Sequence, residues 1–189
     1  MTMSRYADHH PDAAPVGRVV VLPGRVYTPD GPLLFFAAQT ALMRSWEVRQ
    51  VWWEPPRFES DDDEVAWVGD QLTAAVAGYD GRVLVVAKSL GTLAAEAAAA
   101  LGYEAAWLTP LLTEPDAAAA LTSYPAEQLV VIGDRDPYFS QEVLDALPGE
   151  QLVVAGDHIL RIPGNPGAMV ASHETFVRTF DTWLARRSV

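Results

Sequence analysis

The sequence predicts an α/β fold with a doubly wound, mostly parallel sheet of about six strands. Short apolar runs rich in β-branched residues recur along the 189 residues, and helical stretches separate them. The runs are continuous rather than alternating, which is typical of strands that are buried on both faces of a parallel sheet. In such a sheet, ligands bind outside the carboxyl ends of the strands, so reactive residues at those ends are candidates for a site.

Six segments are expected to form the strands. They are residues 19–22, 48–53, 83–86, 104–108, 129–132 and 152–154, of which 104–108 has the weakest pattern. Residues 1–17 lack an apolar run, so they are predicted to form a flexible tail. Residues 18–189 are predicted to form a single domain, which is large enough to bury a core without disulfides.

Helices are expected between these strands. They are residues 32–45, a segment that begins after Ser60, residues 90–101, a short one near 116–121, one that opens at Ser140, and 168–187. Ser60 and Ser140 are typical N-cap residues, and acids follow Ser60 in the first turn, where the helix dipole favours them. Gly102 stands where a C-cap glycine belongs.

Composition and charge exclude several classes of function. The net charge of −12 argues against nucleic acid, whose phosphates require a basic footprint. No apolar stretch approaches the roughly 20 residues of a membrane span. The absence of cysteine excludes disulfides and zinc–thiolate sites, and it fits a cytoplasmic location. Eight acids and one base fall within residues 54–80. We interpret this segment as a solvated helix face, with an acidic docking surface as the alternative.

One serine stands where a nucleophile is expected. The sequence Ala87-Lys88-Ser89-Leu90-Gly91 follows directly on the strand 83–86 and precedes a helix. A serine on such a sharp turn is a nucleophile elbow, which needs small residues two places before and two places after it. The backbone N–H of Leu90 then points to where an oxyanion would form. Lys88 is given no catalytic role.

An acid and a base follow later strands. Asp134 and Asp136 come just after residues 129–132, and His158 comes just after 152–154. Together with Ser89 they could form a Ser-His-Asp triad at the carboxyl edge of the sheet. Asp157 is expected to point away from that site. His173 lies within the last helix, where we interpret it as a structural residue.

The chain order Ser89, Asp136, His158 and the elbow resemble those of the α/β-hydrolase family, in particular its small, lidless esterases and lipases. The resemblance extends over nearly the whole chain, although Ala87 replaces the usual glycine. It implies a minimal α/β-hydrolase fold that lacks the first two strands of larger members. Only 18 residues lie between Thr109 and Gln128, where relatives insert a cap, so no cap domain is expected.

The same resemblance suggests roles for further residues. In the family the acid lies three places after a glycine, which selects Asp136 over Asp134, and Pro137 would hold Asp136 in an extended conformation. The loop at 22–27 stands where relatives carry a histidine–glycine pair. The backbone N–H of Arg25 is then the second oxyanion donor, with Val26 as the alternative.

These features predict a serine hydrolase that cleaves a small carboxylic ester or thioester through an acyl-enzyme on Ser89. His158 would act as the base and Asp136 would orient it. No cofactor or metal is expected, because the sequence has no Gly-rich phosphate loop, dinucleotide fingerprint or HExxH. Two alternatives remain open: a hydrolase-fold protein that binds or scaffolds without catalysis, and an acyltransferase or peptidase that uses the same triad.

Overall fold

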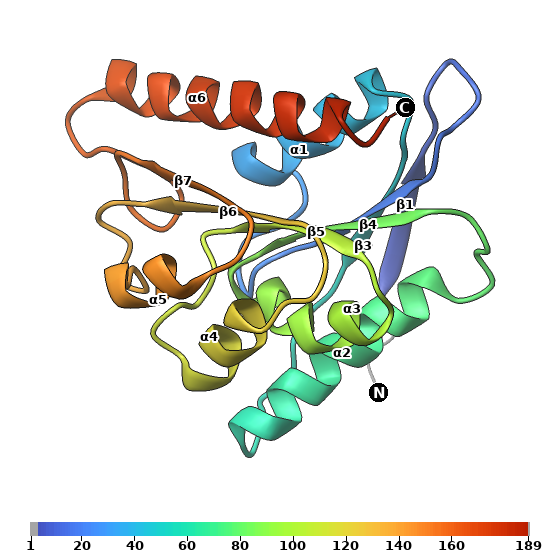
Figure 1. The fold of residues 1–189 in the computed structure, drawn as a ribbon, viewed down its shortest axis with the longest axis horizontal. Coiled ribbons are helices and arrows are strands. Elements are labelled where there is room, and N and C mark those ends of the chain that lie inside the picture. Colours follow the sequence, from blue (N-terminus) through green and yellow to red (C-terminus); the bar gives the residue numbers. More distant parts are fainter. Residues whose placement is uncertain (1–3, 189) are drawn as a thin grey trace.

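The computed structural model describes residues 4–188, and these form a seven-stranded sheet with helices on both faces (Figure 1). The strand order is β1-β3-β2-β4-β5-β6-β7. The strands are β1 (Arg5–His9), β2 (Arg18–Leu22), β3 (Glu47–Trp52), β4 (Val83–Lys88), β5 (Glu104–Leu108), β6 (Gln128–Gly133) and β7 (Glu150–Val154). Neighbouring strands from β3 to β7 are all parallel. The predicted doubly wound, mostly parallel sheet and its six strands are therefore confirmed.

Helices cover the sheet in two layers (Figure 1). One face carries α1 (Pro32–Met43) and α6 (Pro166–Ala185). The other carries α2 (Asp61–Val76), α3 (Ala95–Ala100), α4 (Pro115–Thr122) and α5 (Gln141–Ala146). The helix predicted over 90–101 begins instead as a 3-10 helix, η1 (Ser89–Ala94), which leads into α3. None of the helices within residues 4–188 combines the length and hydrophobicity needed to cross a membrane.

The core lies on both sides of the sheet, which explains why the apolar runs are continuous. In β2, Val20 and Leu22 join the cluster under α2 and α3, whereas Val19 and Val21 join the cluster under α1 and α6. All four side chains are fully buried. β7 is the exception, because it forms an edge of the sheet and most of its residues are partly or fully exposed.

The prediction of a flexible tail is wrong for Arg5–His9. These residues form β1, which pairs antiparallel with the outer edge of β3. The Arg49 guanidinium donates to both carboxylate oxygens of Asp8, at 2.8 and 2.7 Å, so polar contacts help to hold the strand. Most side chains of β1 are exposed, and for that reason the sequence shows no apolar pattern there. Residues 1–3 of the predicted tail lie outside the described residues.

The connection between β5 and β6 carries only α4. The eight residues of this helix pack beside α3 and α5 and do not form a separate cap. The carboxyl edge of the sheet is therefore not covered by an inserted domain at this point, as the short connection predicted.

Candidate active site

Ser89 occupies a strained turn at the end of β4. The residue has a φ of +51°, in the left-handed region that non-glycine residues rarely adopt. Such a conformation costs about 1–3 kcal/mol, and it persists only when the surroundings impose it. Thr92 helps to impose it, because its Oγ1 donates to the Ser89 carbonyl at 2.6 Å. The backbone geometry of an elbow is thus present at the predicted serine.

Close packing explains the small residues around Ser89. A Cβ added at Gly91 would lie 2.7 Å from the Leu22 carbonyl oxygen and 2.8 Å from that of Pro23. The Gly91 N–H donates to the same Pro23 oxygen at 3.1 Å. A Cβ added at Gly24 would lie 3.4 Å from the Ser89 Cβ. The loop after β2 therefore lies directly against the elbow.

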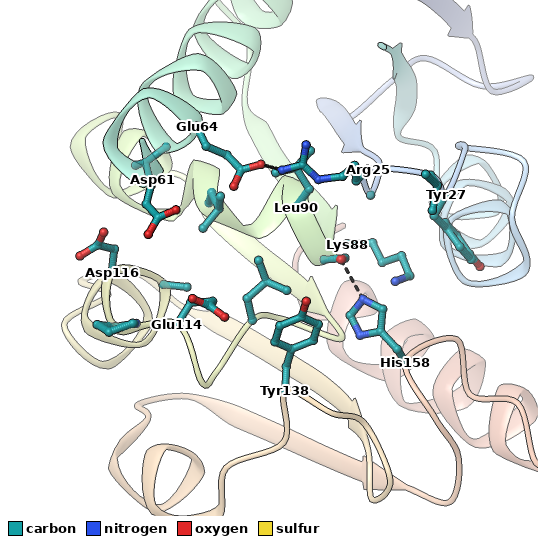
Figure 2. A pocket seen from close by; sticks show the side chains of 18 of the residues that line it. Arg25, Tyr27, Asp61, Glu64, Lys88, Leu90, Glu114, Asp116, Tyr138 and His158 are labelled. Carbon is teal, nitrogen blue, oxygen red and sulfur yellow. Dashed lines mark hydrogen bonds and ion pairs between the residues drawn. The ribbon is translucent and has the colours of Figure 1, made fainter. Parts of the chain in front are cut away.

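Ser89, His158 and Asp136 form a continuous hydrogen-bonded chain. The His158 Nε2 lies 2.8 Å from the Ser89 Oγ, the contact marked by the dashed line near His158 in Figure 2. The His158 Nδ1 lies 2.8 and 3.0 Å from the two carboxylate oxygens of Asp136. An ionised carboxylate can only accept, so Nδ1 carries the proton and Nε2 is free to accept from the serine hydroxyl. Asp136 has a fully buried side chain, whereas that of His158 is 24% exposed.

The two candidate acids of the β6 loop have different partners. Asp136 faces His158, and its Oδ1 also accepts from the Tyr138 N–H at 2.9 Å. The Asp134 Oδ1 instead accepts from the Gly156 N–H at 3.0 Å. Asp134 therefore ties the β6 loop to the loop that carries His158.

The loop of His158 is also held from within. Asp157 accepts from the backbone N–H groups of Ile159 and Arg161, at 3.0 and 2.9 Å, and from the Arg161 side chain at 3.0 Å. Partial burial opposes ionisation of Asp157, but these hydrogen bonds outweigh it and lower its pKa. Asp157 thus contacts its own loop rather than the triad, as expected.

The two predicted oxyanion donors, Leu90 and Arg25, line the same cavity of about 660 Å³ as Ser89 and His158. Leu90 stands in the first turn of η1, where backbone N–H groups have no acceptor within the helix. The loop of Arg25 is braced by Trp53, whose Nε1 donates to the Gly24 carbonyl at 3.2 Å.

Acidic side chains form one wall of the cavity. Asp61 and Glu64, from the first turn of α2, and Glu114 and Asp116, near the start of α4, lie on the side opposite His158 (Figure 2). The Arg25 side chain pairs with Glu64. Part of the acidic segment predicted as a solvated face therefore reaches the cavity. Within residues 4–188 no group of three or more His, Asp or Glu side chains is arranged to hold a metal ion.

Lys88 is the site residue that sequence reasoning set aside. Its side chain is buried, 1% exposed, yet it lines the cavity between Tyr27 and His158 (Figure 2). Its Nζ lies 4.7 Å from the centre of the Tyr27 ring. Burial lowers the pKa of Lys88 to about 7, although the Asp136 and Asp157 carboxylates act in the opposite direction. The sequence held one signal of this burial, namely that Lys88 directly continues the apolar run of β4.

Replacing Lys88 with methionine should change how stability depends on pH. Between pH 7 and 10.5 the unfolded chain binds more protons at Lys88 than the folded chain does, so this residue makes the free energy of unfolding rise with pH. Lys88→Met removes that contribution. The stability of the variant relative to the wild type should fall by about 2–4 kcal/mol from pH 6 to pH 10. Urea unfolding at both pH values measures it, and a constant difference would contradict burial of a neutral amine.

Comparison with known proteins gives structural but not sequence relatives. No protein-family model matches the chain, and no curated protein matches it. Among solved structures, an α/β serine hydrolase homologue from Coxiella burnetii is 16% identical, with a TM-score of 0.70, over 92% of this chain and 90% of that one. A serine hydrolase without a lid from Xanthomonas campestris is 15% identical, with a TM-score of 0.66, over 96% and 88%.

An esterase from Pyrococcus furiosus is similar to the same extent. It is 14% identical to this chain, with a TM-score of 0.68, over 97% of this chain and 93% of that one. At such identities the likeness concerns the fold, and it extends over almost the full length of both chains. The chain therefore has the fold of the small α/β-hydrolases that lack a lid.

Proposed function

We propose that this protein is a serine hydrolase that cleaves a small carboxylic ester or thioester through an acyl-enzyme. The hydrogen-bonded chain from Ser89 through His158 to Asp136, which opens into a cavity, carries the proposal. A serine hydroxyl is a weak nucleophile unless a base takes its proton, and the neutral Nε2 of His158 is placed to do so.

Acylation would use each of these groups in turn. Ser89 Oγ attacks the carbonyl carbon while His158 Nε2 accepts its proton, and the buried Asp136 stabilises the resulting imidazolium. The N–H groups of Leu90 and Arg25 would donate to the oxyanion, a contribution of about 3 kcal/mol each. His158 then returns the proton to the departing alcohol or thiol. The product of this step is an ester between Ser89 and the acyl group.

Deacylation repeats the sequence with water. His158 removes a proton from a water molecule, which attacks the acyl carbonyl, and Ser89 leaves with that proton. Within residues 4–188 no inserted domain covers the cavity, so water can reach the acyl-enzyme. The strained backbone of Ser89 and its short contact with His158 favour an enzyme over a binding or scaffold protein.

A fluorophosphonate probe tests the proposal directly. Such probes phosphonylate a serine whose hydroxyl is activated by a base, so wild-type protein should be labelled at Ser89 and Ser89→Ala should not be labelled. Ser123→Ala removes an exposed serine hydroxyl elsewhere, on the loop after α4, and should leave labelling unchanged. Intact-protein and peptide mass spectrometry measures both results. Absence of labelling on the wild type would refute the proposed nucleophile.

A further inference from the structure

A second hollow lies beside the candidate active site. This groove, of about 740 Å³, is formed by α1, α6 and the loop of His158. It shares two lining residues with the cavity of Ser89, namely Tyr27 and Ile159. Ile159 directly follows His158 in the chain. The groove therefore adjoins the candidate active site at the side where His158 lies.

The floor of the groove is apolar and partly exposed. Phe36 from α1 is 38% exposed, Ile159 is 38% exposed, and Val170 from α6 is 61% exposed. The charged groups at its rim are paired: Arg178 with Glu174, and Arg161 with Asp157. A continuous apolar surface of this kind, framed by charges, marks a place where an apolar partner or ligand binds.

One buried polar atom in the wall lacks a partner. His173 is 8% exposed, and its Nδ1 lies 2.9 Å from the Met169 carbonyl. Because a carbonyl can only accept, Nδ1 carries the proton and Nε2 is left as a bare acceptor. No group within residues 4–188 donates to that Nε2. Because this Nε2 is shielded from solvent, His173 presents no accessible acceptor to the groove, which is consistent with an apolar occupant.

The position of His158 decides which part of an ester this groove could receive. In the proposed reaction His158 Nε2 returns its proton to the leaving oxygen, so the alcohol portion must lie on the His158 side of Ser89. The groove begins at Ile159, the neighbour of His158. The acidic wall lies on the opposite side of the cavity (Figure 2).

We propose that the groove between α1 and α6 binds an aliphatic chain on the alcohol portion of the ester. This inference rests on the proposed function and assigns it a substrate class: esters of medium-chain alcohols. Each methylene that the groove buries should raise kcat/KM by about two- to fourfold. The acyl portion, which lies on the other side of Ser89, should show no such dependence on this groove.

Two ester series test the assignment. The first is a set of acetates from ethyl to octyl acetate, and the second is a set of p-nitrophenyl esters from acetate to octanoate. In the wild type, kcat/KM should rise along the alkyl acetates. Val170→Asp places a carboxylate in the groove and should abolish that rise, whereas the dependence of kcat/KM on acyl-chain length in the p-nitrophenyl series should stay as in the wild type. Met43→Asp is the matched control, because Met43 is 81% exposed at the far end of α1 and does not line the groove.

The possible outcomes distinguish a failure of the groove assignment from a failure of the proposed reaction. Loss of chain-length dependence in the acyl series alone would assign the groove to the acyl portion and overturn the inference. A wild-type dimer that Val170→Asp dissociates, seen by sedimentation, would make the groove a contact between two copies and would also overturn it. If no ester is cleaved, the groove is tested alone by measuring the binding of 1-octanol to Ser89→Ala. Adding Val170→Asp to this variant should weaken the binding, and adding Met43→Asp should not. Equal binding of 1-octanol with and without these added substitutions would refute the inference.

Discussion

Replacing Ser89 with alanine should lower kcat on a small activated ester by about 10⁴–10⁶-fold, and His158→Ala should cause a loss of the same size. The hydroxyl and the imidazole are joined by a 2.8 Å contact, and neither works alone: an alkoxide does not form without the base, and the base has no nucleophile without the serine. The measurement is the rate of p-nitrophenyl acetate hydrolysis, corrected for the spontaneous reaction.

The double variant shows whether the two residues act as a unit. Because each single change already disables the same step, Ser89→Ala/His158→Ala should lose little more than either single variant. Some acceleration over water should survive in all three, because the Leu90 and Arg25 N–H groups remain. Losses that multiply in the double variant would mean that the residues act independently. Full activity in Ser89→Ala would refute the nucleophile and favour a binding protein.

Most of the fold could be predicted because its signal is local. The central strands β2, β4 and β6 are buried on both faces, so their residues form apolar runs that any window along the sequence detects. β1 could not be predicted by that signal. Its side chains are mostly exposed, and what holds it is the edge of β3 and the pair between Asp8 and Arg49, 41 residues apart in the chain.

The candidate site likewise has a part that the sequence predicted and a part that it did not. Ser89, Asp136 and His158 each follow a strand, and parallel strands bring their carboxyl ends to one edge, so their proximity followed from the sequence. Lys88 and the groove did not follow. The burial of the Lys88 side chain depends on how Tyr27 and the loops that carry Asp136 and Asp157 pack around it. The groove depends on the packing of α1 beside α6, helices that are far apart in the sequence.

The choice between the two acids of the β6 loop leads to the second large effect. Asp136→Asn should lower kcat by about 10²–10⁴-fold. The asparagine amide has the size of the carboxylate but no charge, so it cannot stabilise an imidazolium at His158. Its NH₂ group would also favour the tautomer with the proton on Nε2, which could then no longer accept from Ser89. The loss should appear in kcat, with little change in KM.

Asp134→Asn is the matched control for this prediction, because it makes the same chemical change two residues away. The Asp134 Oδ1 accepts from the Gly156 N–H, and an asparagine oxygen can accept the same bond, so the loop should keep its position and kcat should stay within about threefold. Asp134→Ala removes that bond and should lower the free energy of unfolding by about 1–3 kcal/mol. If Asp134→Asn instead lowered kcat as much as Asp136→Asn, the assignment of Asp136 as the acid of the triad would be refuted. The two substitutions make the same chemical change, and only that of Asp136 removes a carboxylate that faces His158.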